Sequence, residues 1–320
     1  MIDIYGTLGP ACSDAATLEE MLRLGMTGVR LNLSHVTLPE SAPLVEALRE
    51  AGRRAGVQPK LLIDMQGPEL RIGKLPAPLK LREGESVSPA ALHLPEAVLS
   101  CLTPGQELLL DDGKLLLVSE GDTLRVLRGG TLQSRKSAAL PGREIRLPAL
   151  TESDRGNLAV AKDYGVTGVM QPFVRSREDL EEVRAALPEG LRLFAKIESL
   201  AGVEQLPALM EAADEIVIAR GDLGNAVPLW ELPVLQKRIS AACRRKGVPF
   251  MVVTQMLASM EHSAVPTRAE VCDICNAVMD GAASVMVTGE TAVGEYPVEV
   301  IRYLANTVRA AQNGLQRGEI

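Results

Sequence analysis

Short apolar runs alternate with helical stretches along most of this chain. The runs have the length of buried strands, and in the stretches between them apolar residues recur at helical spacing. The predicted strands are residues 2–7, 28–33, 60–64, 168–173, 192–197, 215–219, 249–254 and 284–288. The predicted helices include residues 16–23, 41–55, 179–186, 232–246 and 268–280. Such strand–helix units are most simply arranged as a closed (β/α)8 barrel of the α/β class, a TIM barrel.

The alternation breaks between residues 71 and 145, where the helical spacing fades. Turn residues there separate runs rich in Leu and Val, and we predict hairpin turns at 111–113 (Asp-Asp-Gly) and 128–130 (Arg-Gly-Gly). We therefore predict a small β-rich lid domain inserted after strand 3, with residues 1–70 and 146–320 forming the barrel. The barrel would then hold about 245 residues, close to the ~250 typical of this fold.

Composition narrows the classes of function. Lys and Arg total 34 and Asp and Glu total 41 of the 320 residues, and there are one Trp, four Tyr and three Phe. The net charge of −7 and the few aromatic rings argue against a nucleic-acid partner. We expect no membrane span and no signal peptide, because no uncharged apolar run reaches ~18 residues and the N-terminus lacks a basic region.

The five cysteines are scattered, which is typical of a protein in the reducing cytoplasm. We therefore expect a cytoplasmic location. Cys272 and Cys275 lie three positions apart in a predicted helix without a second pair, which indicates packing and not a metal site.

Polar residues gather where the predicted strands end, and in a barrel that end carries the chemistry. Arg30, Asn32 and Ser34 occupy every second position at the end of the second strand, so their side chains share one face. The alternative is an outer, solvated face. The other strand ends contribute Asp64, Lys196 with Glu198, Arg220-Gly221-Asp222, Thr254 and Glu290.

These residue types indicate phosphoryl transfer. Glu198 and Asp222 are hard oxygen donors without a cluster of Cys or His, which suits Mg²⁺ (or Mn²⁺) completed by water and substrate oxygens. Arg30, Arg71 and Lys196 would bring positive charge to the same mouth, where it would neutralise a transferred phosphoryl group. Taken alone, Lys196 and Glu198 would more often form a surface ion pair.

The sequence resembles the pyruvate kinase family over nearly its whole length. The resemblance rests on nine motifs in the family's order: GTLGPA (6–11), RLNLSH (30–35), IDMQGPELR (63–71), LPG (140–142), AKIES (195–199), ARGDLG (219–224), TQML (254–257), PTRAE (266–270) and GETAVGEYP (289–297). It implies a phosphotransferase that converts phosphoenolpyruvate and ADP to pyruvate and ATP, with Mg²⁺ (or Mn²⁺) and K⁺ as cofactors.

The resemblance also implies a role for each matching residue around the substrate. Arg30 would bind the phosphate of phosphoenolpyruvate, and Lys196 would stabilise charge on the phosphoryl group and the enolate. The backbone near Gly221 would meet the substrate carboxylate, and Thr254 would lie near the carbon that is protonated. The implied metal ligands are Glu198 and Asp222 for Mg²⁺, and Asn32, Ser34, Asp64 and the carbonyl of Met65 for K⁺.

The resemblance implies that Arg71 and Lys136 contact the phosphates of the nucleotide, with Asn32 and His35 nearby. For His35, a structural role as a hydrogen-bonding residue is an equally good interpretation. Asp112 would face the nucleotide-bound metal. The family carries Glu in its K⁺-requiring branch at the position of Glu69 in this sequence, which favours K⁺ dependence.

The sequence departs from the family's pattern in three places that bear on function. Gln66 replaces a lysine, Pro172 replaces a serine, and the sequence ends at Ile320, where the family's C-terminal effector domain would follow. We therefore expect a short form that a sugar bisphosphate does not activate, as a monomer or a homodimer. Two alternatives stay open: a metal-dependent lyase or decarboxylase acting through a 2-oxo acid enolate, and a non-catalytic relative that binds phosphoenolpyruvate.

Overall fold

The chain divides into two units, one of which is inserted into the other. In the computed structural model the described residues are 2–34, 36–68, 70–111, 113–143, 145 and 147–319. The first unit comprises Met1–Gly67 and Ala149–Ile320, and the second comprises Pro68–Pro148. The sequence placed the insertion at 71–145, so each observed boundary lies three residues outside the predicted one.

The first unit is a closed barrel of eight parallel strands in the order β1-β15-β14-β13-β12-β11-β3-β2. This arrangement confirms the predicted (β/α)8 fold. The strands are β1 (Asp3–Thr7), β2 (Gly28–Asn32), β3 (Lys60–Asp64), β11 (Gly168–Gln171), β12 (Arg192–Ile197), β13 (Glu215–Ala219), β14 (Phe250–Val253) and β15 (Ser284–Met286). Strands β11 and β14 end before the predicted positions, because Phe173 and Thr254 have positive φ values of 50° and 79° and turn the chain out of the sheet.

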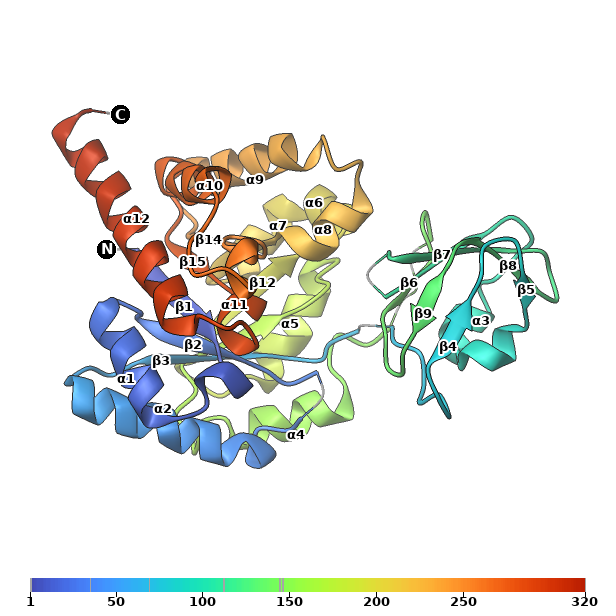
Figure 1. Cartoon of the computed structure of the whole chain (residues 1–320), viewed down its shortest axis with the longest axis horizontal. Coiled ribbons are helices and arrows are strands. Elements are labelled where there is room, and N and C mark those ends of the chain that lie inside the picture. The colour runs from blue at the N-terminus through green and yellow to red at the C-terminus, as the bar shows by residue number, and fades with distance from the viewer. Residues whose placement is uncertain are drawn as a thin grey trace. The chain divides into compact units, whose positions relative to one another are not determined.

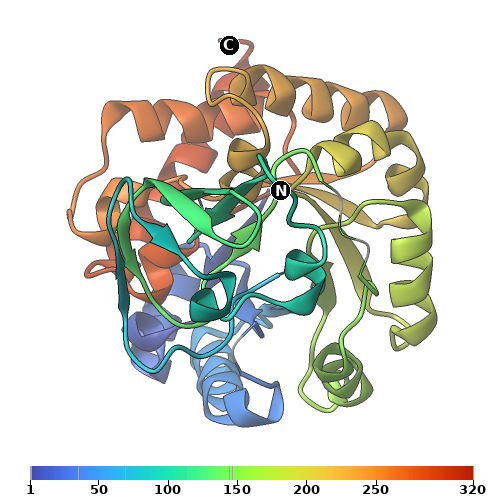
Figure 2. The ribbon, with the colours of Figure 1, turned by 90° about the vertical axis from the view of Figure 1, so that its right-hand side faces the viewer.

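Helices surround the barrel strands as an outer ring (Figures 1 and 2). The α-helices of this unit are α1 (Ala15–Leu24), α2 (Ala42–Ala55), α4 (Glu152–Val160), α5 (Arg177–Ala186), α6 (Leu200–Glu204), α7 (Leu206–Ala212), α8 (Arg220–Ala226), α9 (Leu232–Lys246), α10 (Arg268–Met279), α11 (Gly289–Ala292) and α12 (Pro297–Arg317). Short 3₁₀ turns lie at η1 (Pro10–Cys12), η2 (Pro39–Ser41) and η4 (Ala258–Glu261). Helices α4 and α10 both begin with a capping box, formed by Thr151 with Asp154 and by Thr267 with Glu270.

The barrel strands are buried on both faces, as expected for a parallel sheet covered by helices. Their inward side chains fill the barrel interior with an apolar cluster of Tyr5, Leu62, Met170, Phe194, Val217, Ala219, Met251, Val253 and Met286. Buried polar side chains lie at strand ends instead: Glu215 and Ser284 begin β13 and β15, and Asp64 and Gln171 end β3 and β11. Buried polar groups therefore lie at both ends of the barrel strands, and those at the carboxyl ends are Asp64 and Gln171.

The second unit has its own apolar core and two antiparallel sheets, with strand orders β10-β6-β7-β8-β5 and β4-β9. Strands β6 and β7 pair as antiparallel neighbours, as a turn between them requires; of the turn predicted at 111–113, Asp112 lies outside the described residues. The hairpin predicted at 128–130 is wrong, because β8 and β9 belong to different sheets. Gly129 instead carries the chain from one sheet to the other, where a Cβ would lie 2.5 Å from the carbonyl oxygen of Leu81. The elements are β4 (Leu79–Leu81), β5 (Ser86–Val87), η3 (Pro89–Leu92), α3 (Glu96–Leu99), β6 (Glu107–Leu110), β7 (Leu115–Ser119), β8 (Leu124–Arg128), β9 (Gly130–Leu132) and β10 (Ala138–Ala139).

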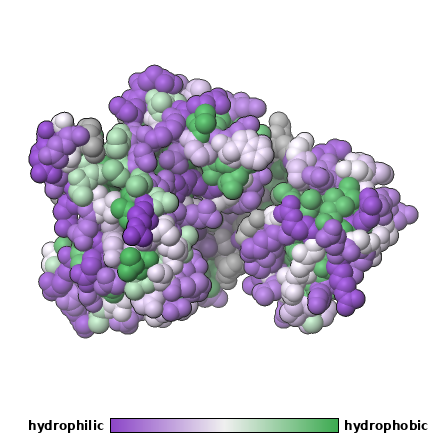
Figure 3. All heavy atoms as spheres, turned by 45° about the horizontal axis from the view of Figure 1, so that its top comes forward, coloured by the Kyte–Doolittle hydropathy of each residue, from purple (hydrophilic) through white to green (hydrophobic). Residues whose placement is uncertain are grey.

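The surface shown in Figure 3 is dominated by hydrophilic residues, with small hydrophobic patches between them. Among the described residues, no helix is both long enough and apolar enough to cross a membrane.

Candidate active site

Four charged side chains meet at the carboxyl ends of β2, β3 and β12. Asp64 is at the centre: its Oδ2 lies 2.8 Å from Nε and 2.7 Å from Nη2 of Arg30, and 3.0 Å from Nζ of Lys196. The Lys196 Nζ also lies 3.0 Å from Oε1 of Glu198. Charges of alternating sign therefore run through Arg30, Asp64, Lys196 and Glu198, which we call the ion-pair chain. The predicted residues Arg30, Asp64, Lys196 and Glu198 thus lie in one contiguous cluster.

Mutual contact keeps the two central groups of the ion-pair chain ionised despite their burial. Burial opposes ionisation of the Asp64 carboxyl, but the charges of Lys196 and Arg30 outweigh it and lower the pKa of Asp64 below its ordinary value. Burial likewise opposes the charged ammonium of Lys196, yet Asp64 and Glu198 raise the pKa of Lys196 above its ordinary value. Arg30 and Lys196, which the sequence predicts as sources of positive charge at the mouth, are therefore partnered cations.

Glu198 and Asp222 follow neighbouring strands. Glu198 is 4% exposed, and its Oε2 accepts a 2.7 Å hydrogen bond from the backbone N–H of Phe173. Asp222 lies in the first turn of α8, directly after β13, and is half-buried. Among the described residues, no group of three or more His, Cys, Asp or Glu could hold a metal ion. The two carboxylates fit Mg²⁺ by their chemistry, provided that water and substrate oxygens supply the other ligands.

The residues implied for K⁺ lie at the ends of β2 and β3, where Asn32 is the cross-strand partner of Asp64. The Oδ1 of Asn32 accepts hydrogen bonds from the backbone N–H of Ser34 at 3.2 Å and from its Oγ at 2.9 Å. The buried Met65 donates its N–H to the carbonyl of Met170 at 3.1 Å. These oxygen donors fit a monovalent cation by type, and such a cation would share Asp64 with Arg30 and Lys196.

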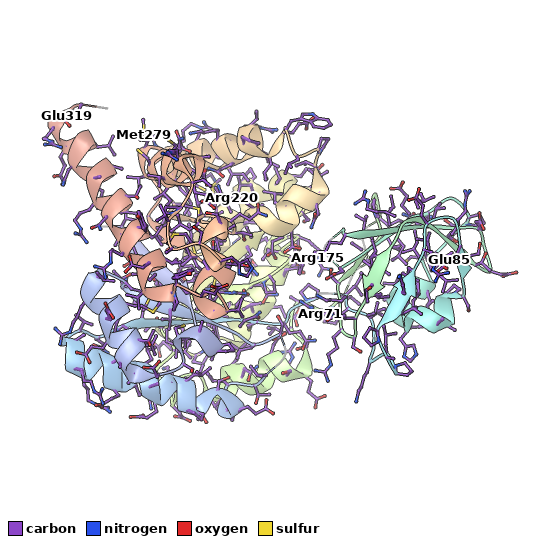
Figure 4. The ribbon with its side chains drawn as sticks, viewed as in Figure 1. Arg71, Glu85, Arg175, Arg220, Met279 and Glu319 are labelled. Carbon is purple, nitrogen blue, oxygen red and sulfur yellow. The ribbon has the colours of Figure 1, made fainter. Side chains whose placement is uncertain are left out.

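Thr254, at the end of β14, has a left-handed backbone that is strained for a β-branched residue. Its carbonyl accepts two hydrogen bonds from Arg220, at 3.0 Å from Nε and 2.7 Å from Nη2. The Nη1 of Arg220, a residue labelled in Figure 4, pairs with Oδ2 of Asp273 at 2.6 Å. A Cβ at Gly221 would approach the Thr254 Cγ2 to 3.1 Å. Arg220 therefore holds the Thr254 backbone, a role that its position in the sequence does not reveal.

Two further buried carboxylates hold the loops around this mouth. Glu290 accepts hydrogen bonds from the backbone N–H groups of Leu257 at 3.1 Å and Thr288 at 2.6 Å, and thereby ties the loops after β14 and β15. Asp154 accepts hydrogen bonds from Gln66 and Gly67, the residues that follow Met65. The sequence named Glu290 only as a strand-end residue and missed Asp154, because the partners of both are fixed by tertiary structure.

Arg71 and Lys136 belong to the inserted unit, where their segments pair. The N–H of Ile72 bonds to the Lys136 carbonyl at 2.9 Å, and the Lys136 Nζ lies 2.8 Å from Oδ1 of Asp111. Burial opposes ionisation of Asp111, but its hydrogen bond from Lys136 lowers the pKa of that carboxyl. Three residues implied by the resemblance lie outside the described residues: His35, Glu69 and Asp112.

Comparison with known proteins gives a consistent result. The family described as "Pyruvate kinase, barrel domain" matches residues 1–301. The chain is 34% identical to a pyruvate kinase of Geobacillus stearothermophilus, over 99% of this chain and 58% of the relative. It is 38% identical to pyruvate kinases of Methylorubrum extorquens and Aeropyrum pernix, over 93% and 95% of this chain and 66% and 69% of those relatives. The chain therefore spans about three fifths to two thirds of the length of these relatives.

Proposed function

The chain belongs to the pyruvate kinase family, and on that premise we propose that it transfers a phosphoryl group from phosphoenolpyruvate to ADP, giving pyruvate and ATP. The observation that carries the proposal is the ion-pair chain. It supplies a guanidinium and an ammonium whose positions and charges are fixed by Asp64 and Glu198 before a substrate arrives. Charged groups fixed in advance are the main source of catalysis in phosphoryl transfer.

In this reaction the bond between phosphorus and the enol oxygen of phosphoenolpyruvate breaks, and a terminal phosphate oxygen of ADP bonds to phosphorus. Arg30 would bind the phosphate, and Lys196 would stabilise the charge that passes from the phosphoryl group to the enolate oxygen. The enolate carbon then takes a proton and becomes the methyl group of pyruvate. Thr254, held by Arg220, would lie beside that carbon, and the close backbone approach at Gly221 would face the carboxylate.

Metal and nucleotide binding complete the proposal. Glu198 and Asp222 would hold Mg²⁺ (or Mn²⁺), whose charge offsets the negative charge of the phosphates when it is bound. K⁺ would be held by Asn32, Ser34, Asp64 and the carbonyl of Met65. The residues proposed to contact the nucleotide are Arg71, Lys136, Asn32 and His35.

The test is an assay of pyruvate formation by the purified chain with Mg²⁺, K⁺, phosphoenolpyruvate and ADP. We expect ADP-dependent turnover that falls at least about 100-fold in Lys196→Met, as when a fixed charge-stabilising donor is removed. Lys60→Met is the matched control, because Lys60 pairs with Asp3 at the opposite ends of the strands. Absence of turnover under every cation condition would overturn the proposal. Exchange of pyruvate methyl protons without ADP affinity would favour a lyase, and tight binding of phosphoenolpyruvate with no turnover would favour a non-catalytic relative.

A further inference from the structure

Asp154 is a fully buried carboxylate outside the ion-pair chain, with an exposed fraction of 0%. It is the third residue of α4, and its Oδ2 accepts hydrogen bonds from the N–H and the Oγ1 of Thr151, at 2.9 and 2.8 Å. A capping box needs only the hydrogen bond from the Thr151 N–H to this carboxylate and the one from the Asp154 N–H to Oγ1 of Thr151. The carboxylate also accepts from the N–H of Gln66 at 2.8 Å, on Oδ1, and from the N–H of Gly67 at 3.0 Å, on Oδ2.

These partners come from the two places where the chain passes between the units. Gln66 and Gly67 are the last residues before the inserted unit, which begins at Pro68. Ala149 is the first residue after it, and Thr151 follows two positions later. We call residues 66–67 the exit crossing and residues 149–151 the return crossing. One buried carboxylate therefore binds both crossings, whose residues lie more than eighty positions apart in the sequence.

Contacts at the end of β11 hold the same two crossings independently. The Nε2 of Gln171 donates a 2.8 Å hydrogen bond to the carbonyl of Ala149 in the return crossing. In the exit crossing, Gly67 has a φ of +57°, and a Cβ there would lie 2.5 Å from Cγ of Pro172. Only glycine fits this close approach in a left-handed conformation. Both crossings are thus fixed against the barrel.

We propose that Asp154 is a positioning residue that locks both crossings and, through the exit crossing, fixes the backbone of Asp64 and Met65. Met65 directly precedes Gln66, so the hydrogen bond from Gln66 to Asp154 restrains the peptide that carries the Met65 carbonyl. The return crossing restrains the other end of the segment that carries Arg71 and Lys136. The expected effect on catalysis rests on the proposed function, whereas the effect on the backbone does not.

Glu270 offers a matched control. It is the third residue of α10, and its carboxylate also accepts from its capping threonine, Thr267, and from two donors of a distant residue, the N–H and Oγ of Ser259. It therefore has the same architecture as Asp154 but touches neither crossing. An amide at either position offers one acceptor oxygen and turns an N–H₂ toward backbone donors. Asp154→Asn and Glu270→Gln therefore make comparable chemical changes at different places.

The first measurement is amide hydrogen exchange of the full chain, without substrates. In Asp154→Asn we expect exchange at Gln66, Gly67 and Thr151 to rise at least about tenfold, as for the loss of about 1.4 kcal/mol of protection. In Glu270→Gln we expect faster exchange at Ser259 and Thr267, and unchanged exchange at the crossings. Unchanged exchange at Gln66 and Gly67 in Asp154→Asn overturns the proposal. If that variant does not fold, Thr151→Val replaces it. This change removes one of the four hydrogen bonds to the Asp154 carboxylate and also the bond from the Asp154 N–H to Oγ1 of Thr151. We expect exchange at both crossings to accelerate about threefold, and unchanged rates at Gln66 and Gly67 also overturn the proposal.

The second measurement separates positioning from general destabilisation. In Asp154→Asn we expect the K⁺ concentration for half-activation and the KM for ADP to rise several-fold, while kcat at saturation changes less than about twofold. A purely structural role would lower kcat through loss of folded protein and leave both concentrations unchanged, which would overturn the positioning role. Glu270→Gln should leave both concentrations unchanged, and an equal rise there would also contradict the proposal. If the unmodified chain has no kinase activity, the proposed function fails while the exchange measurement still decides the role of Asp154.

Discussion

The ion-pair chain makes Lys196 a stability determinant as well as a catalytic candidate. Its Nζ lies 3.0 Å from both Asp64 and Glu198, and its side chain is 13% exposed. Lys196→Met keeps the length of the side chain but leaves both carboxylates without that cation. Removing one partner of a buried ion pair costs about 3–5 kcal/mol. Asp64 keeps its contacts with Arg30, and Glu198 keeps the N–H of Phe173, so we expect the lower end of this range.

A loss of about 3 kcal/mol corresponds to a fall in Tm of about 6–12 °C for a domain of this size. Circular dichroism at 222 nm reports on the barrel, because the described α-helices other than the four-residue α3 lie in that unit. Lys60→Met is the control: Lys60 pairs with Asp3 and its side chain is 42% exposed, so we expect a cost below about 1 kcal/mol.

The pH dependence gives an independent check. The folded-state pKa of Asp64 is lowered, so its contribution to stability is present above its unfolded pKa and is lost as the pH falls through the folded value. The folded-state pKa of Lys196 is raised, so its contribution is present below its unfolded pKa and is lost as the pH rises through the folded value. The Tm difference between the unmodified chain and Lys196→Met should thus be constant from about pH 6 to 9 and narrow below about pH 4. A difference under about 2 °C at pH 7, or one that persists unchanged at pH 3, would refute this reasoning.

Of three further predictions, two concern the Thr254 backbone and one concerns the thiols. Arg220→Ala removes both hydrogen bonds to the Thr254 carbonyl, so we expect kcat to fall at least about tenfold. Thr254→Gly relieves the backbone strain at φ 79° and should raise the free energy of unfolding, measured in urea, by about 1 kcal/mol. A glycine variant that is less stable than the unmodified chain would contradict the assignment of strain. Burial raises the pKa of Cys243 to about 12. In the native chain at pH 8 we therefore expect iodoacetamide to modify the exposed Cys272 and to spare Cys243, as measured by peptide mass spectrometry. Modification of both thiols at equal rates would show that this part of the barrel opens readily.

The periodicity of the sequence was sufficient to predict the barrel, because a strand buried on both faces is a continuous apolar run wherever its neighbours lie. Three predicted strands match the observed bounds, those at 60–64, 192–197 and 215–219. The ends of β11 and β14 were misplaced because Phe173 and Thr254 are ordinary strand residues by type, and only the tertiary structure puts them in left-handed conformations.

The candidate site was predictable to the extent that its residues stand at strand ends. Asp64, Lys196 and Glu198 stand at such ends, and an ion pair between Lys196 and Glu198 was considered. The pairing of Asp64 with Arg30 and Lys196 was not predicted, because side-chain length and the curvature of the barrel decide which charges meet. Asp154 was not predicted as part of the site, because its spacing from Thr151 is fully explained by a helix cap. Of the two cysteines that the sequence assigned to packing, Cys275 packs against the core, but Cys272 is exposed because it lies on the side of α10 opposite the buried residues Ile274, Ala277 and Val278.

The alternating charges of the ion-pair chain have a consequence for how ligands enter. Two positive and two negative groups cancel, so the mouth offers little net field to draw an anion from a distance. An anion arriving alone must compete with Asp64 and Glu198 for Lys196, and a cation arriving alone must compete with Lys196 for Glu198. When both arrive together, the partners are exchanged and no charge is left uncompensated. We therefore expect an anion and a cation to bind this site cooperatively, so that the affinity for each rises with the concentration of the other.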